Sequence, residues 1–203
     1  MASNKKFNWS EYYAKHSESK PTLTLLTGLK FFNRKDLPLP KTSIDIGCGQ
    51  GTDVAELLRQ GWDVIAVDKE AEAEQILVNK FYKFHGKKLI TQVQKMENII
   101  IPPITLVNAS FSLPFCNPKK FPQLWTNITS SITIGGIFCG QLFGTEDGWA
   151  SNKNMTFHHR KSLNDLFKKF RIHFLHEENS ISNTSSGEEK NWHVFDLVAE
   201  KLK

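Results

Sequence analysis

The 203-residue chain has a formal net charge of +5 and an ordinary balance of apolar and charged residues, and its length suits one domain with a well-buried core. No run of about 18 apolar residues is present, which excludes a membrane-spanning helix. No apolar run follows the first lysines, so we expect no secretory signal and a cytoplasmic location. The basic residues are dispersed in ones and twos, a pattern that favours solvated helix faces over a nucleic-acid interface.

The apolar residues predict strands that alternate with helices. A helix is expected over 21–32, and short strands at 43–47 and 63–67 flank a helix that ends near Gly61. This order makes a strand–helix–strand unit of about 25 residues. Further strands are expected at 89–93, 104–110, 135–143, 171–178 and 192–202, with helices that carry Leu77, Trp125 and Phe167 on their apolar faces.

The last two predicted strands are joined by the polar segment 179–190, which reads as a loop without a helix. A direct return of this kind predicts an antiparallel final pair. The rest of the alternation predicts an α/β fold with a mostly parallel sheet and helices on both faces.

The segment "SIDIGCGQGTD" places a glycine-rich loop between a strand and a helix, where a nucleotide-like ligand commonly binds. Asp68 ends the next strand, 21 residues after Gly47, where a carboxylate can accept both hydroxyls of a ribose. The pattern is GxGxG, with Thr52 in place of the third glycine of the dinucleotide fingerprint. Asp45 precedes the loop and would repel a pyrophosphate, but it suits an ammonium group. S-adenosylmethionine (SAM) has a ribose, an ammonium group and no phosphate.

Two segments, "DIGCGQG" and "VIAVD", resemble the first two motifs of the class I SAM-dependent methyltransferases. The segments "LVNASFSLPF", "MTFHHR" and "NWHVFDLVA" extend the resemblance over most of the chain, to the small bacterial TehB-like group. The resemblance implies a Rossmann-like fold with a seven-stranded, mostly parallel sheet whose last strand is antiparallel. It implies one domain over 1–203, with an N-terminal helical lid at 1–35 and a catalytic core at 36–203.

The same resemblance implies the cofactor site. The loop would pack against SAM, Asp45 would lie near its amino-acid end and Asp68 would hold the ribose. The residues after the third strand would flank the adenine, and the residues at the end of the fourth strand would lie beneath the methionine portion. The cofactor-binding residues are then Asp45, Gly47, Cys48, Gly49, Gly51, Asp68, Met96, Glu97, Asn108, Ala109 and Ser110.

The acceptor side is predicted from topology, because loops after parallel strands lie on the cofactor side of the sheet. His193 and one of His158 and His159 are predicted near the transferable methyl group, where a neutral imidazole could act as a general base. Each of these histidines could equally be structural. The residues predicted to contact the acceptor are Tyr12, Asp147, Trp149 and Trp192, although packing explains the tryptophans as well.

Cofactor motifs and short insertions favour a SAM-dependent methyltransferase acting on a small molecule. One alternative is a binding module for SAM or S-adenosylhomocysteine (SAH) without turnover. Another is a nucleic-acid methyltransferase. It is disfavoured because "NASF" keeps Asn108 and Phe111 but lacks both prolines of the Asn/Asp-Pro-Pro-aromatic motif found in amino-group methyltransferases.

No metal site is expected, because the three cysteines are far apart and the adjacent His158 and His159 lack the spacing of a helical metal motif. No membrane partner is expected either. The sequence leaves the choice between a monomer and a homodimer open.

Overall fold

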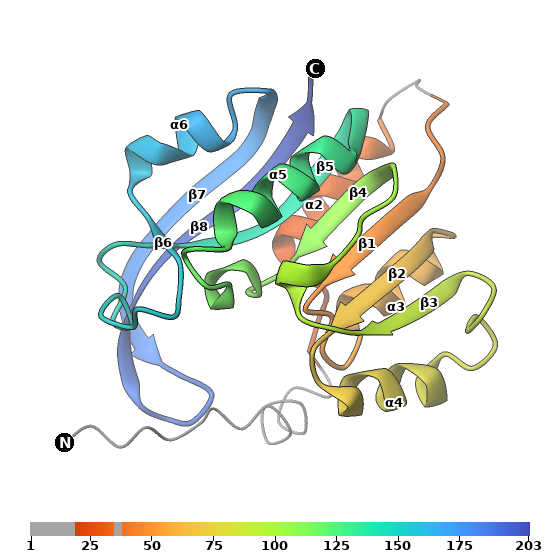
Figure 1. The fold of residues 1–203 in the computed structure, drawn as a ribbon, viewed down its shortest axis with the longest axis horizontal. Helices are drawn as coiled ribbons and strands as arrows, with labels where there is room; N and C mark the ends of the chain where they lie inside the picture. Colours follow the sequence, from red (N-terminus) through yellow and green to blue (C-terminus); the bar gives the residue numbers. More distant parts are fainter. Residues whose placement is uncertain (1–18, 35–37) are drawn as a thin grey trace.

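The computed structural model describes residues 19–34 and 38–203, which form a twisted sheet with helices on both faces (Figure 1). The helices are α2 (Leu23–Phe32), α3 (Thr52–Arg59), α4 (Ala71–Lys80), α5 (Phe121–Ser131) and α6 (Leu163–Leu166). The strands are β1 (Thr42–Ile46), β2 (Asp63–Asp68), β3 (Leu89–Val93), β4 (Ile104–Ala109), β5 (Ile132–Gly144), β6 (Phe157–His158), β7 (Phe170–Asn183) and β8 (Glu189–Lys201).

The strand order is β3-β2-β1-β4-β5-β8-β7, with the two-residue β6 paired to β5. Strands β1 to β5 are parallel to their sheet neighbours in this series, and β8 is antiparallel to both β5 and β7. This topology confirms the predicted Rossmann-like sheet with an antiparallel last strand. Strand β6 was not predicted, because a strand of two residues is too short to produce a recognisable sequence pattern.

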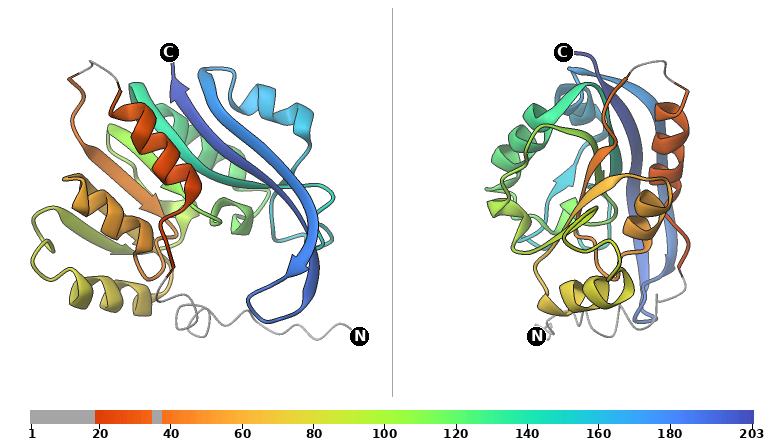
Figure 2. Two further views of the ribbon diagram at one scale, coloured as in Figure 1. Left: turned by 180° about the vertical axis from the view of Figure 1, so that it is seen from behind. Right: turned by 90° about the vertical axis from the view of Figure 1, so that its right-hand side faces the viewer.

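Two apolar layers hold the helices against the sheet (Figure 2). Leu25 of α2, Leu57 of α3 and Leu77 of α4 share one buried cluster. Trp125 of α5 and Leu163 of α6 belong to the cluster on the opposite face. Burial on both faces explains why the central strands read as nearly continuous apolar runs.

The segment 179–190 was predicted to be a loop, and this prediction was wrong. Strand β7 continues to Asn183, β8 begins at Glu189, and only 184–188 connect them. The paired ends project as a two-stranded ribbon (Figure 1), so most of their side chains on β7 are exposed and polar. Without a buried face the segment has no apolar alternation, and the turn depends on Gly187 at φ 88°.

The sheet creates one point at which the chain order reverses. Strand β1 has β2 on one side and β4 on the other, and the carboxyl ends of all three point to the same edge (Figure 1). Crossover connections leave the sheet in opposite directions here, so a crevice opens beyond the strand ends. The glycine-rich loop follows β1 at this place.

Candidate functional site

The glycine-rich loop is held in a backbone conformation that favours glycine. Gly47, Gly49 and Gly51 have φ of 76°, 50° and 77°. A Cβ on Gly47 would lie 2.5 Å from the Cβ of Ser112, so a side chain there would displace the loop after β4. A Cβ on Gly51 would press on Leu77 of α4 at 3.0 Å. The first glycine therefore brings the loop close to β4, and the third allows α3 and α4 to pack.

A cavity of about 390 Å³ lies beyond the carboxyl ends of β1, β2 and β4. Its walls come from the segment before α2, the glycine-rich loop, the end of β2, the turn after β3 and the segment after β4. The lining residues are Ser19, Lys20, Thr22, Asp45, Gly47, Cys48, Gly49, Gln50, Thr52, Asp53, Val67, Asp68, Lys69, Gln94, Lys95, Met96, Glu97, Ser110, Phe111, Ser112 and Phe115.

Asp68 is fixed at the edge of this cavity by backbone hydrogen bonds. The N–H of Gly49 donates to Oδ2 at 2.9 Å, and the N–H of Glu70 donates to Oδ1 at 3.0 Å. Each carboxylate oxygen can accept more than one hydrogen bond. The side chain is thus oriented before any ligand arrives, and it retains capacity to accept from hydroxyl groups.

A second acidic centre lies deeper, where Asp45 and Asp53 share one amide. Asn108 Nδ2 donates to Asp45 Oδ1 at 2.8 Å and to Asp53 Oδ2 at 2.9 Å. Burial, reinforced by the negative charge of Asp53, raises the pKa of Asp45 well above its ordinary value. A cationic group placed here would relieve both effects, because it replaces lost hydration and offsets the repulsion.

Asp53 was not among the predicted site residues, although it lines the cavity and is 6% exposed. Its carboxylate also accepts hydrogen bonds from the N–H of Thr22 at 2.8 Å, from Thr22 Oγ1 at 2.9 Å and from Ser110 Oγ at 2.7 Å. Asp53 therefore connects the segment before α2 to the carboxyl end of β4 and the residue that follows it. An acid in the first turn of α3 also has an ordinary explanation in the helix dipole, so its sequence position alone does not assign Asp53 to the site.

The structure brings most of the predicted cofactor residues together. The predicted residues that line the cavity are Asp45, Gly47, Cys48, Gly49, Asp68, Met96, Glu97 and Ser110. Gly51, Asn108 and Ala109 do not line it. Gly51 supports helix packing, Asn108 orients the two acids from behind, and Ala109 is fully buried in the core.

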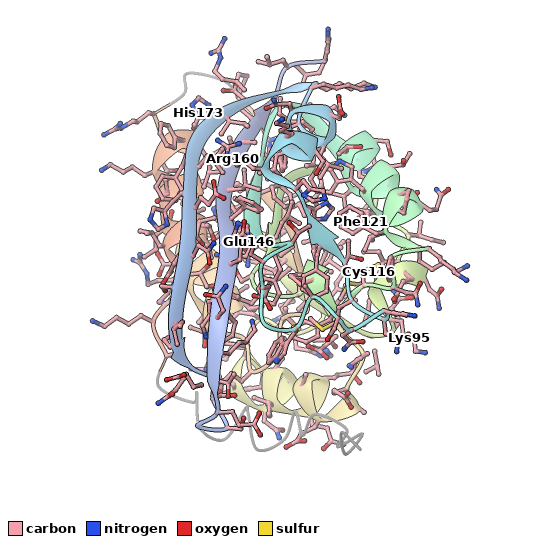
Figure 3. The ribbon with its side chains drawn as sticks, turned by 90° about the vertical axis from the view of Figure 1, so that its left-hand side faces the viewer. Lys95, Cys116, Phe121, Glu146, Arg160 and His173 are labelled. Atoms are coloured by element: carbon pink, nitrogen blue, oxygen red, sulfur yellow. The ribbon has the colours of Figure 1, made fainter. Side chains whose placement is uncertain are left out.

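Several lining residues were not among the predicted site residues. Lys20 precedes α2, Gln94 and Lys95 follow β3, and Phe111 and Phe115 follow β4; Lys95 is labelled in Figure 3. These positions meet only because five separate chain segments end at one edge of the sheet. Their distance in sequence exceeds what local spacing can connect.

His193 does not line the cavity. It lies on β8, is 4% exposed and fills the space that Gly144 leaves beside it. The backbone N–H of Glu146 (labelled in Figure 3) donates to Nδ1 at 3.1 Å, which places the ring proton on Nε2, 3.0 Å from Glu177 Oε1. Both ring nitrogens thus have partners within the protein, and the catalytic role of His193 stays a prediction.

His158 and His159 also lie outside the cavity lining. The His158 ring packs on Phe121 with centroids 4.8 Å apart, its Nε2 is buried without a partner, and burial lowers its pKa to about 4. His159 is exposed, with Nδ1 3.2 Å from Thr145 Oγ1. Their catalytic role likewise stays a prediction.

The predicted acceptor residues Asp147, Trp149 and Trp192 are gathered around a lysine that the sequence did not single out. Lys190 Nζ donates to Asp147 Oδ2 at 2.7 Å, and both side chains are almost fully buried. The ammonium lies 4.0 Å from the ring centroid of Trp149, 3.5 Å from that of Trp192 and 4.6 Å from that of Phe143. These residues form a cation-centred cluster next to the cavity, not in its lining.

The remaining predicted features have simple outcomes. Tyr12 and most of the predicted lid at 1–35 fall in residues 1–18, outside the described part of the chain. In 19–34 and 38–203, no group of three or more histidines, cysteines or acids is placed to hold a metal ion. Within the same ranges, no helix is both long and apolar enough to cross a membrane.

Residues 11–183 match the model of a protein family described as tellurite resistance protein TehB. The chain belongs to the TehB family. No curated protein sequence matches it closely. Among solved structures, TehB from Haemophilus influenzae has the same fold as this chain, with a TM-score of 0.75 and 16% identity. The match covers 96% of this chain and 67% of that one.

Two other similar structures carry more specific names. One is the 1,6-didemethyltoxoflavin-N1-methyltransferase of Burkholderia thailandensis, with a TM-score of 0.68 and 15% identity over 96% of this chain and 87% of that one. The other is the magnesium protoporphyrin IX methyltransferase of Synechocystis, with a TM-score of 0.67 and 10% identity over 95% and 94%. Both are described with bound SAH, and at these identities they establish the fold of this TehB-family chain.

Proposed function

We propose that this TehB-family protein is a SAM-dependent methyltransferase that acts on a small molecule. The observation that carries the proposal is a crevice that Asp68, the Asp45–Asp53 pair and the glycine-rich loop line together. Carboxylates at these two places complement a ribose and an ammonium group. The similar structures named as methyltransferases with bound SAH support it.

The residues present fit this cofactor. We propose that Asp68 accepts from the ribose hydroxyls and that Asp45 and Asp53 face the ammonium group. Gly47 and Gly49 would let the loop backbone approach closely, with Cys48 between them. Met96, Glu97 and Ser110 would complete the contacts with the cofactor, whereas Gly51, Asn108 and Ala109 would support them from outside the cavity.

SAM, when bound, supplies a methyl group attached to a sulfonium sulfur. This sulfur is also the leaving group of the transfer. The protein therefore has to orient the acceptor and exclude water. In the described ranges no histidine lines the cavity, so proton removal by an imidazole has no direct route in this arrangement. We infer that the acceptor attacks without giving a proton to a histidine. It would attack either as a neutral nucleophile or as one that is already ionised.

A radiolabel experiment separates an enzyme from a binding module without turnover. The protein would be incubated with methyl-labelled SAM and a panel of small thiols, amines, hydroxyl compounds and oxyanions, with the Asp68→Ala variant as the control. We expect label to reach at least one small molecule in the wild type only. If no panel member is labelled while SAH binds, the binding-module alternative is favoured; label in added RNA or DNA would favour the nucleic-acid alternative.

Three further expectations accompany this proposal. One domain over 1–203, with its lid, stays a prediction because residues 1–18 lie outside the description. The cytoplasmic location also stays a prediction; the free thiols of Cys48, Cys116 and Cys139 are compatible with it. Size-exclusion chromatography with light scattering would decide between a monomer and a homodimer.

A further inference from the structure

Phe111 is the one non-glycine residue in the described ranges with a positive φ, at 50°. A left-handed backbone costs a residue with a side chain roughly 1–2 kcal/mol. Such strain persists only where the surroundings impose it, and it concentrates at functional sites. Phe111 lines the cavity directly after β4.

The surroundings that impose this conformation are buried and polar. The N–H of Phe111 donates to Gln141 Oε1 at 3.0 Å. Gln141 is 2% exposed, and its Nε2 donates to Thr24 Oγ1 at 3.1 Å and to Asp196 Oδ1 at 2.9 Å. The amide is thereby fixed by α2 and β8 together, so it presents its oxygen to one backbone position after β4.

The ring of Phe111 does not gain burial from this arrangement, since it is 42% exposed. A left-handed backbone at this position costs free energy, and the partly exposed ring recovers less of that cost than a fully buried ring would. The exposure is explained if the ring contacts a ligand in the cavity that it lines.

A second ring marks the same end of the cavity. Phe115 also lines it and packs on Trp149 with centroids 6.2 Å apart, while Phe111 packs edge-on against Phe143 at 6.5 Å. Behind them lies the buried cluster around Lys190, which keeps Phe143 and Trp149 in place. The carboxylates that fit a ribose and an ammonium group come from other segments of the chain, whereas the segment after β4 supplies both of these rings beside Ser110 and Ser112.

We propose that Phe111 is a specificity-determining residue that stacks on the methyl acceptor, and that the acceptor is a planar aromatic compound. This inference rests on the proposed function, because it names the substrate class of the same site. Aromatic rings prefer offset or edge contacts with other rings, which an equally large saturated ring cannot reproduce.

Phenol and cyclohexanol test this directly, since both are neutral at pH 7 and share ring size and hydroxyl group. Their dissociation constants would be measured by ligand-observed NMR on protein saturated with SAH, for the wild type, Phe111→Leu, Phe111→Tyr and Phe84→Leu. Phe84 is the matched control, because it is 37% exposed and lies outside the cavity lining. The affinity of each protein for SAH alone would be measured by calorimetry.

We expect the wild type to prefer phenol by about 3- to 10-fold. Phe111→Leu should lose this preference, whereas Phe111→Tyr and Phe84→Leu should keep it. Equal affinities, absence of phenol binding, persistence of the preference in Phe111→Leu or its loss in Phe84→Leu would each overturn the inference. Absence of SAH binding would instead overturn the proposed function, so the two failures are distinguishable.

Discussion

The two halves of this molecule handle polar side chains differently. Around the β1, β2 and β4 ends, acidic groups such as Asp45 and Asp68 line a cavity and remain able to bind a ligand. Around β5 and β8, Asp147 and His193 are equally polar but have partners inside the protein. Proximity to the same edge of a sheet therefore does not make a polar residue part of a site. What matters is whether its hydrogen-bonding capacity is already taken.

The largest effect should come from removing one member of the buried pair in the β5–β8 half. Asp147→Ala leaves the Lys190 ammonium without its carboxylate, and we expect a loss of about 3–5 kcal/mol in the free energy of unfolding. Adding Lys190→Met should restore much of it, because no unpaired charge then stays buried. Urea unfolding measures both, with the exposed Asp165→Ala as control. A stable Asp147→Ala protein that no longer transfers methyl groups would instead support a substrate role.

His193→Ala should come next. It removes the acceptor of the Glu146 N–H and the partner of Glu177, so we expect a loss of about 1–3 kcal/mol. Thermal unfolding and SAH calorimetry check this, and SAH affinity should be retained. A catalytic role makes the opposite forecast: near-normal stability with a transfer rate lowered by roughly 10²–10⁴-fold.

In the β1–β4 half, the raised pKa of Asp45 predicts a pH dependence of binding. Where Asp45 is protonated, it must lose its proton before a ligand ammonium can use the carboxylate. SAH affinity should therefore increase as the pH rises above about 4, the ordinary carboxyl pKa. Calorimetry in buffers of different ionisation enthalpy should show proton release on binding. Asp45→Asn should bind about 10-fold more weakly and lose the dependence; a variant that keeps it would show that another group titrates.

The last effect is the smallest at neutral pH, because it concerns stability in acid. Burial lowers the pKa of His158 to about 4, below the unfolded value of about 6.5. The protonated ring therefore favours the unfolded chain, so this contribution to stability is full above pH 6.5 and is lost as the pH falls towards 4. His158→Phe should flatten that part of the pH–stability curve by up to about 3 kcal/mol at pH 4, with SAH affinity unchanged. An unaltered curve would place the acid-labile group elsewhere.

The sequence predicted the β1–β4 half well because its evidence is local. Three glycines, an acid before them and an acid at the next strand end follow one another within 24 positions, from Asp45 to Asp68. Asp53 belongs to the same stretch but was not among the predicted residues, and its place at a helix start gives it a second explanation. The mostly parallel sheet followed from the alternation of strands and helices, and the antiparallel final pair followed from their direct connection.

The acceptor side could not be predicted in the same way. Topology placed His193 at the correct edge of the sheet, but whether its ring faced a cavity or Glu177 depended on packing across β5, β7 and β8. Lys190 was assigned to a polar loop, yet it is buried among aromatic rings. Phe111 was noted only as the aromatic residue of an incomplete motif, and its strained backbone is visible only in the φ angle, which no residue pattern reveals for an amino acid with a side chain.

One titration tests the account most directly. SAH would be added in a calorimeter to the wild type, to Asp68→Ala and to Asp63→Ala, an exposed acid at the opposite end of the same strand. We predict saturable binding of one SAH per chain, a loss of about 100-fold in affinity for Asp68→Ala, because two charge-assisted hydrogen bonds are removed, and no change for Asp63→Ala. Absence of SAH binding to the folded wild type, or equal affinities in all three proteins, would contradict the account.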